Sequence, residues 1–522
     1  MFTSKMIRRS PLALAIRKAI KKASEIMGCA GFSLRDYQRK GVGWMIRQEL
    51  KSKYPGGILA DDPGLGKTIQ TLGLMAGLPK KTLLIVPLAV LDQWQQIITT
   101  VFGYKSLYVH YGSGKLSNSI DIQSRKFDIC LTTHGSSASN KKKCYTTQLH
   151  IPNFWERIII DEGHVIRNPN TKLFKTNKNY SNIIPSRWIL SGTPIQNKRK
   201  DIITLLDFIG ISPKDSNVDL DSYILQYVLR RTKKVLISEG LISCDFNTHL
   251  IPFDNSAEQH IYENLETESL ERLADLKYSG TALHEYEANV LETIVRLRQA
   301  TSHPNIALNA LKNKYCDDFV HIPCFSGEST KITRITNDLL KVTGLSLVFC
   351  HYRDEMSRVQ HSVEDHGITC KLYHGGLSKI QRGNVLDSFK LANKSAPTVL
   401  IIQIMAGGVG LNLQEFSNVF ILSPDWNPTN EFQAISRAHR FGQTETVKVH
   451  KYVLTYNPEF MENPDHFDTV TTIDQRILLV QITKRTMMAN ILNDPSLMFS
   501  EKITQSELLC KDRFSIVSEY EL

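Results

Sequence analysis

Short apolar runs alternate with longer stretches of helical periodicity along most of this chain. Such alternation is typical of a parallel sheet with helices on both faces. In the first part it predicts strands at residues 57–60, 82–87, 127–133, 157–161 and 188–191. A second alternating block predicts strands at residues 346–350, 369–373, 398–402 and 419–422. The pattern therefore predicts an α/β protein with two parallel-sheet lobes in tandem.

Between about residues 211 and 320 the pattern is helical and charged, most clearly at 262–276 and 284–298. It predicts a helical insertion or connector between the two lobes. The acidic stretch 457–468, which holds two prolines, is predicted as a surface loop. The chain is thus divided into a basic segment (1–30), a first lobe (31–210), a helical insertion and connector (211–325), a second lobe (326–480), and a C-terminal helix and tail (481–522).

The first 27 residues combine a cationic side with an apolar side. The apolar members fall on one helical face, which predicts an amphipathic helix. Its cations, set against the single acid Glu25, are Lys5, Arg8, Arg9, Arg17, Lys18, Lys21 and Lys22. Three interpretations are open: a surface helix packed on the first lobe, a contact with DNA, and an organelle transit peptide.

Composition narrows the class of protein. The 522 residues carry a net charge of +11, which fits a polyanionic partner such as nucleic acid. No apolar run approaches the length of about 18 residues that a membrane span needs, so no membrane association is expected. The nine cysteines show no C-x-x-C spacing, which indicates neither a zinc site nor a disulfide framework. An intracellular protein is expected.

A glycine-rich stretch at residues 61–68 lies between a predicted strand and a predicted helix. Backbone N–H groups in such a turn converge on phosphate oxygens, the lysine reaches the outer phosphates, and the hydroxyl binds Mg²⁺. The residues expected to do so are Gly64, Leu65, Gly66, Lys67 and Thr68. Asp61 stands at the position of the usual first glycine, so a purely structural turn is the alternative.

Two adjacent carboxylates, Asp161 and Glu162, end the predicted strand 157–161. In a nucleotidase the first holds Mg²⁺ and the second takes a proton from the attacking water. Neighbouring residues at a strand end point in different directions, which suits this division of roles. A solvated turn is the alternative.

Residues 433–443 are predicted to be helical, with Gln433, Arg437 and Arg440 on one face. Two arginines on one face could stabilise charge that develops on a transferred phosphoryl group. An ordinary solvated basic helix is the alternative.

Further motifs stand in order around these sites, at residues 34–38, 86–94, 191–197, 406–413 and 425–428. The ordered set, over about residues 32–492, resembles the Swi/Snf-type DNA-dependent ATPases of helicase superfamily 2. A compact form, similar to those of large DNA viruses, is indicated. The resemblance implies two RecA-like lobes, use of ATP and Mg²⁺, and translocation along double-stranded DNA without strand separation.

The resemblance also implies individual roles. Lys67, Asp161, Glu162, Arg437 and Arg440 would be catalytic. Thr68 and Asp161 would bind the metal, and Gln38 would contact adenine. Gly410 and Gln433 would add nucleotide contacts from the second lobe. The residues implied near the DNA backbone are Thr133, His134, Asn168, Gly407 and Gly408. Phosphate contacts carry no sequence information, so largely sequence-independent binding is expected.

The leading hypothesis is therefore an ATP-dependent duplex-DNA translocase in transcription, repair, chromatin or viral genome processing. One alternative is a strand-separating helicase of the same superfamily. The other is an ATP-gated factor that binds a transcription or repair protein. No chromatin-reading module is found beside the motifs, so a nucleosome-reading machine is less favoured. Either the nucleus or a viral factory or virion would suit such a protein.

Overall fold

The computed structural model describes residues 11–138, 147–211, 220–237, 240, 242–315, 321–390, 397–407, 411–461, 471–492 and 494. The chain divides into two compact units. Unit 1 runs up to Gly240 and resumes at Met487, and unit 2 runs from Leu241 to Thr486. Over the described residues, no helix has the length and apolar character needed to cross a membrane.

Unit 1 is built on a seven-stranded parallel sheet with the order β3-β4-β2-β5-β6-β1-β7. Its strands are β1 (Gly56–Leu59), β2 (Thr82–Val86), β3 (Leu107–Val109), β4 (Ile129–Thr133), β5 (Arg157–Asp161), β6 (Ser186–Leu190) and β7 (Val228–Leu229). Along β5, Ile158 and Ile160 face one apolar cluster whereas Ile159 faces another. Both faces of the sheet are therefore buried, as a parallel sheet requires.

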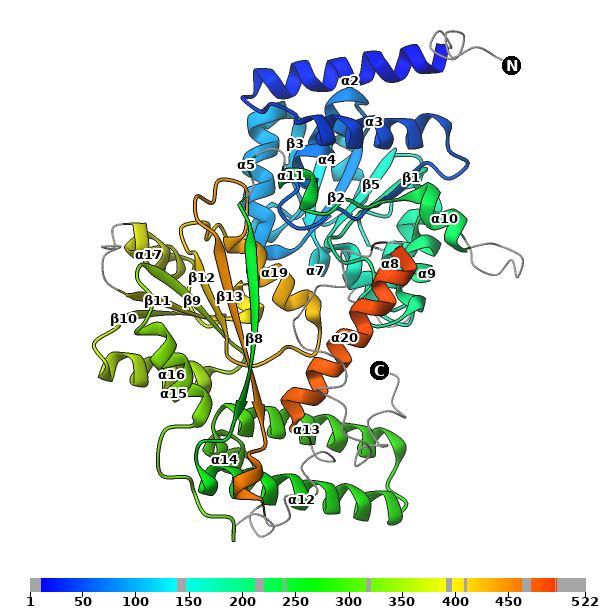
Figure 1. Ribbon diagram of the computed structural model, residues 1–522. Helices are drawn as coiled ribbons and strands as arrows, with labels where there is room; N and C mark the ends of the chain where they lie inside the picture. Colours follow the sequence, from blue (N-terminus) through cyan, green and yellow to red (C-terminus); the bar gives the residue numbers. More distant parts are fainter. Residues whose placement is uncertain are drawn as a thin grey trace, which may run out of the picture. The chain divides into compact units, whose positions relative to one another are not determined.

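The helices of unit 1 cover these two faces (Figure 1). They are α2 (Pro11–Cys29), α3 (Asp36–Lys51), α4 (Lys67–Gly77), α5 (Leu91–Phe102), α6 (Ser119–Ser124), α7 (His134–Ser137), α8 (Lys172–Ile183), α9 (Arg199–Phe208), α10 (Leu220–Tyr227) and α11 (Lys234–Ile237).

The predicted N-terminal amphipathic helix is confirmed as α2, which lies beside α3 in Figure 1. It buries Ala19, Ala23 and Met27 against unit 1. A Cβ atom on Gly77, at the end of α4, would stand only 2.6 Å from the Ala19 carbonyl oxygen. This glycine therefore permits α2 to pack directly on α4, as the first interpretation expects. Residues 1–10 of the predicted segment lie outside the described residues, and the contact with DNA and the transit peptide stay hypotheses.

Unit 2 is built on a six-stranded parallel sheet with the order β10-β11-β9-β12-β13-β8. Its strands are β8 (Cys244–Pro252), β9 (Leu345–Cys350), β10 (Thr369–Tyr373), β11 (Thr398–Gln403), β12 (Asn418–Ile421) and β13 (Val447–Thr455). Its helices are α12 (Ser256–Tyr278), α13 (Leu283–Ser302), α14 (Pro304–Lys314), α15 (Thr330–Leu339), α16 (Arg353–Asp365), α17 (Lys379–Lys390), α18 (Ile404–Gly407) and α19 (Pro428–Ala438). Helix α20 (Ile473–Leu492) begins in unit 2 and ends in unit 1.

The predicted fold class, α/β with two parallel sheets, is confirmed by these two units. Within the stretch predicted as helical, however, β8 is a nine-residue strand that pairs with β13 along its whole length (Figure 1). It is an edge strand, and only one of its nine side chains is buried. A polar edge strand lacks the apolar run that marks a buried strand in sequence. The limits of the five predicted segments stay predictions.

Candidate active site

The glycine-rich stretch forms the loop between β1 and α4, as predicted. Gly64 and Gly66 have φ angles of 96° and 75°, which side-chain-bearing residues rarely adopt. A Cβ atom on Gly66 would also stand 2.6 Å from the Gln38 side-chain nitrogen. The loop leads directly into α4, whose first turn has N–H groups without intrahelical partners. This geometry fits a cradle for phosphate oxygens.

Lys67 and Thr68 occupy the first turn of α4. The Lys67 ammonium donates a hydrogen bond of 2.8 Å to the Asp61 carbonyl oxygen. It also lies 3.4 Å from the place where a Cβ atom on Gly192, in the turn after β6, would stand. The ammonium group is therefore held between the loop and that turn, and the partly exposed Thr68 is the next residue of the helix.

Asp161 is the last residue of β5, and two donors fix its carboxylate. The Trp94 indole N–H donates to Oδ2 at 2.8 Å, and the Glu162 backbone N–H donates to Oδ1 at 3.0 Å. Burial, followed by the adjacent negative charge of Glu162, raises the pKa of Asp161 to about 6. A divalent cation at this place would offset both effects and favour the charged carboxylate.

Glu162 has the left-handed backbone angles φ 48° and ψ 47°, which are uncommon for a residue with a side chain. Its Oε2 atom lies 3.4 Å from His164 Nδ1, and that nitrogen lies 3.3 Å from the Ser191 hydroxyl. The Ser191 hydroxyl in turn accepts a hydrogen bond of 3.2 Å from the Thr193 N–H. The unusual backbone thus turns Glu162 away from Asp161, and the histidine links it to the turn after β6.

These groups gather at one edge of the sheet. Strands β5, β6 and β1 are neighbours and run parallel, so their carboxyl ends meet there. Ligands of open α/β sheets bind at this edge. Within unit 1, the structure therefore brings together the phosphate loop, Lys67, Thr68, Asp161 and Glu162. This donor set fits a triphosphate and a divalent metal ion.

Gln38 lies behind the phosphate loop. Its side-chain N–H group donates to the Tyr37 hydroxyl at 3.2 Å and to the Leu65 carbonyl oxygen at 3.4 Å. Its side-chain oxygen accepts a hydrogen bond of 3.1 Å from the Arg35 N–H. These contacts support the loop, and the contact with adenine stays a prediction.

The residues predicted near DNA have varied surroundings. The Thr133 hydroxyl caps α7 by accepting a hydrogen bond of 3.1 Å from the Ser136 N–H. Burial lowers the pKa of His134 to about 4, and both of its ring nitrogens are shielded from solvent. Asn168 is exposed, and Gly407 ends α18. Gly408, together with the predicted nucleotide contact Gly410, lies outside the described residues. The DNA contacts stay predictions.

The helix predicted over residues 433–443 is wrong in its second half. Helix α19 ends at Ala438, so Gln433 and Arg437 lie on it whereas Arg440 lies in the following turn. The turn is fixed by Gln443, which donates a hydrogen bond of 3.0 Å to the Phe416 carbonyl oxygen. Of the three predicted residues, Gln433 and Arg437 therefore lie one helical turn apart on α19, whereas Arg440 does not share their helix.

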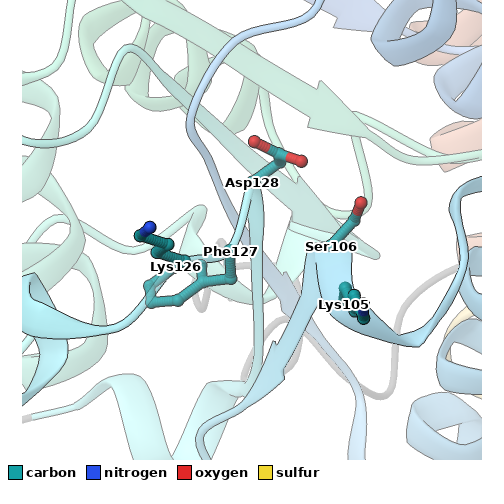
Figure 2. Close-up of a pocket in the computed structure, with 5 residues that line it drawn as sticks. All are labelled: Lys105, Ser106, Lys126, Phe127 and Asp128. Carbon is teal, nitrogen blue, oxygen red and sulfur yellow. The ribbon is translucent and has the colours of Figure 1, made fainter.

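An open pocket of about 430 Å³ lies elsewhere in unit 1 and is drawn in Figure 2. It is lined by Lys105, Ser106, Lys126, Phe127 and Asp128, which precede β3 and β4. Those are the amino ends of parallel strands, whereas the phosphate loop follows the carboxyl end of β1. The pocket is thus separate from the candidate site.

Sequence reasoning missed the residues that hold the loop from behind. Asp61, at the position of the usual first glycine, is fully buried and accepts a hydrogen bond of 3.0 Å from Arg231 Nε. Asp62 pairs with Arg230 Nη2 at 3.0 Å. The feature of the sequence that could have indicated these pairs is two adjacent acids followed, 169 positions later, by two adjacent arginines. Trp94 also holds Asp161 through its indole N–H.

The phosphate loop and the paired acids at a strand end define a class of nucleotide-binding α/β proteins. Comparison with known families goes further. Residues 37–306, more than half of the chain, match the model of the SNF2-related domain. Residues 330–442 match the helicase conserved C-terminal domain. The chain therefore belongs to the SNF2-related family, which confirms the resemblance seen in the sequence.

Two relatives illustrate the range of the family. The chain is 28% identical to the Drosophila melanogaster "ATP-dependent helicase brm" over 95% of its own length and 31% of that protein. It is 29% identical to the "Probable global transactivator" of Orgyia pseudotsugata multicapsid polyhedrosis virus, over 81% of this chain and 86% of the viral protein. The chain thus spans about a third of the Drosophila relative and most of the viral one. The predicted similarity to a compact viral form is confirmed.

Among solved structures, the chain is similar to a Sulfolobus solfataricus SWI2/SNF2 ATPase core in complex with dsDNA. Sequence identity is 24%, and the match covers 91% of this chain and 96% of that one. The TM-score is 0.37, which is too low to carry an argument about geometry.

Proposed function

We propose that this protein is a DNA-stimulated ATPase that moves along double-stranded DNA. The observation that carries the proposal is the convergence of Lys67, Asp161 and Glu162 on the phosphate loop at one sheet edge. Membership of the SNF2-related family supports the same activity. The cofactors would be ATP and Mg²⁺.

The proposed chemistry divides the site into a cradle and a base. The loop N–H groups from Gly64 to Thr68 and the Lys67 ammonium would bind the phosphate oxygens and stabilise charge that develops on them. Thr68 and Asp161 would hold Mg²⁺, which when bound neutralises phosphate charge. Glu162, turned toward His164 by its left-handed backbone, would accept the proton of the attacking water.

The roles of the second lobe rest on the family resemblance. Arg437 and Arg440 would stabilise charge on the transferred phosphoryl group, and Gly410 and Gln433 would contact the nucleotide. Differential grip on DNA through the ATP cycle would convert hydrolysis into steps along the phosphate backbone. The net charge of +11 suits a polyanionic track that is read without sequence preference.

A direct test measures steady-state ATP hydrolysis at fixed salt without nucleic acid and with duplex DNA, single-stranded DNA or RNA. Duplex DNA is expected to stimulate most. Stimulation by RNA beyond that by duplex DNA would contradict the proposal. Lys67→Ala, which removes the phosphate-binding ammonium, is the inactive control.

Two other activities predict different experimental results. A strand-separating helicase would unwind a forked duplex. An ATP-gated factor would hydrolyse ATP at a rate indifferent to DNA and dependent on a transcription or repair protein.

The location proposed for the translocase is the nucleus or, for a viral protein, the viral factory or virion.

A further inference from the structure

Arg230 makes four side-chain hydrogen bonds, although only 7% of its side chain is exposed. Its Nη2 donates to Asp62 Oδ1 at 3.0 Å, and its Nε donates to Asp494 Oδ2 at 2.8 Å. Its Nη1 donates to the carbonyl oxygens of Ala60 at 3.0 Å and Gly192 at 3.2 Å. One guanidinium thus joins four separate places in unit 1.

Three of these places belong to the candidate active site. Ala60 follows β1, Asp62 lies in the phosphate loop, and Gly192 lies in the turn beside Lys67. A Cβ atom on Gly192 would stand 2.8 Å from the Pro63 ring, so this turn also packs directly on the loop. A shift of the loop would therefore alter the surroundings of Arg230 on three sides.

The remaining contact, with Asp494, involves the two places where the chain passes between units. Arg230 follows β7, ten residues before unit 1 gives way to unit 2 after Gly240. The chain leaves unit 2 after Thr486 and returns to unit 1 at Met487. Asp494 lies in this returning stretch. The Arg230–Asp494 pair thus ties the outgoing and returning segments to each other and to the loop.

Arg231 repeats the connection one residue later. Its guanidinium pairs with the buried carboxylate of Asp61, and its Nη2 donates to the Gln70 side-chain oxygen at 2.6 Å. Gln70 lies on α4 and itself donates to Asp61 Oδ2 at 2.9 Å. The loop and the first turn of its helix are therefore both held by the segment that leads to unit 2.

Holding the segment after β7 against the loop would not by itself require these charged side chains. Backbone pairing already joins β7 to the end of β1, since the Ala60 N–H donates to the Leu229 carbonyl oxygen at 2.7 Å. Buried ion pairs commonly add little net stability over apolar contacts, because desolvation offsets their attraction. This hydrogen-bond network joins the phosphate loop to the two segments that connect the units. It is therefore suited to passing a change in the loop to those segments.

We propose that Arg230 and Arg231 are positioning residues that couple occupancy of the phosphate loop to the two segments that connect the units, residues 230–237 and residues 487–492 with Asp494. The inference rests on the proposed function insofar as the loop binds ATP. Phosphate binding moves the loop acids, Arg230 follows Asp62, and Asp494 carries the change into the end of α20.

Hydrogen–deuterium exchange on the full chain tests this coupling. The probe is Mg²⁺ with the non-hydrolysable analogue adenylyl-imidodiphosphate. In the unmodified protein, the analogue is expected to slow exchange in the loop and in both connecting segments. In Asp494→Asn, protection of the loop persists while protection of residues 487–492 falls at least about threefold, as expected for the loss of one modest coupling.

The variants are chosen to separate coupling from folding. Asp494→Asn leaves Arg230 its three other acceptors, and Asp494→Glu keeps the charge and is expected to restore part of the protection. Asp207→Asn removes a partly exposed ion pair of the same unit, Lys178–Asp207 at 3.0 Å, and is the matched control. Equal protection of residues 487–492 in Asp494→Asn and the unmodified protein would overturn the inference.

A kinetic measurement distinguishes this inference from the proposed function. Asp494→Asn is expected to leave the KM for ATP unchanged and to lower the DNA-stimulated kcat about fivefold. Nucleotide-dependent protection without any DNA stimulation in the unmodified protein would refute the proposed function and support the coupling. DNA stimulation with an unaltered kcat in Asp494→Asn would refute the coupling alone.

Discussion

At the residue scale, the candidate site depends on two neighbouring acids with different surroundings. Asp161 is fixed by Trp94 and by the next backbone N–H, whereas Glu162 adopts a left-handed backbone and faces His164. Such outliers persist only where the surrounding structure holds them in place, and they cluster at functional sites. The two carboxylates thus have separate directions and separate proposed roles.

Replacing Glu162 with Gln tests the role of the base. We expect turnover to fall about 10²- to 10⁴-fold, the usual contribution of a general base, with ATP binding retained. Steady-state hydrolysis and equilibrium binding of a fluorescent ATP analogue measure the two effects. Glu156→Gln, at the opposite end of β5, is the matched control, since its side-chain oxygen can still accept from the Lys81 N–H. Equal losses in both variants would contradict the assignment.

A second residue-scale prediction concerns the buried acid Glu49. Burial raises its pKa, but Arg157, whose Nε lies 2.6 Å away, and Lys80 lower it to about 2. This carboxylate therefore stabilises unit 1 fully above its ordinary pKa of 4.5, and the contribution is lost as the pH falls toward 2.

Glu49→Gln removes that charge and leaves Arg157 buried without its counterion. We expect a loss of about 3–5 kcal/mol in the free energy of unfolding at neutral pH, as for other broken buried ion pairs. The difference from the unmodified protein should shrink as the pH falls from 4.5 toward 2. Denaturant unfolding at several pH values measures both effects, and a difference independent of pH would contradict the account.

At the scale of elements, most buried strands could be predicted from sequence because parallel strands with both faces covered are continuous apolar runs. Strand β8 was not predicted because it is a polar edge strand. The end of α19 was not predicted because the helical spacing of the sequence continues past Ala438. The turn that follows the helix is held by a tertiary contact, the hydrogen bond from Gln443 to the Phe416 carbonyl oxygen, which no local pattern encodes.

The exposed cations of helix α2 give a testable prediction about DNA binding. Four of its cations, Arg17, Lys18, Lys21 and Lys22, are exposed on the face away from unit 1. If they contact DNA phosphates, reversing all four to Glu should weaken duplex binding. The slope of log affinity against log salt should then fall by about 0.9 for each phosphate that is no longer neutralised. Fluorescence anisotropy at several salt concentrations measures the slope.

The matched control reverses the charges of Lys105 and Lys126. These lysines line the pocket of Figure 2, at the amino ends of the strands. That change is expected to leave the slope nearly unaltered. An unchanged slope in the α2 variant would leave α2 as a packing helix only.

At the scale of the whole molecule, the motifs that bear chemistry could be predicted because each is local in sequence. The loop glycines, the acids at a strand end and the arginine of α19 are short patterns with a mechanism. The contacts of Arg230 and Arg231 could not be predicted, since they join residues about 170 positions apart. Only the folded unit reveals that Asp61 is a buried partner of Arg231 rather than an imperfect glycine position.

The proposed role of Arg437 gives a prediction at this scale. Arg437→Ala should lower kcat by about 10³-fold or more, within the range of arginine fingers, with little change in the KM for ATP. Arg334→Ala, which changes an arginine on α15 whose side chain is 45% exposed, is the control. Equal kcat values in the two variants would contradict the role.

Displacement of a third strand from a DNA triplex tests whether ATP drives movement along duplex DNA. With Mg²⁺ and ATP, the protein is expected to displace the third strand, whereas Lys67→Ala and Glu162→Gln are not. The duplex beneath the third strand should remain paired. Vigorous DNA-stimulated hydrolysis without displacement, or separation of the duplex strands instead, would show that the protein is not a duplex translocase.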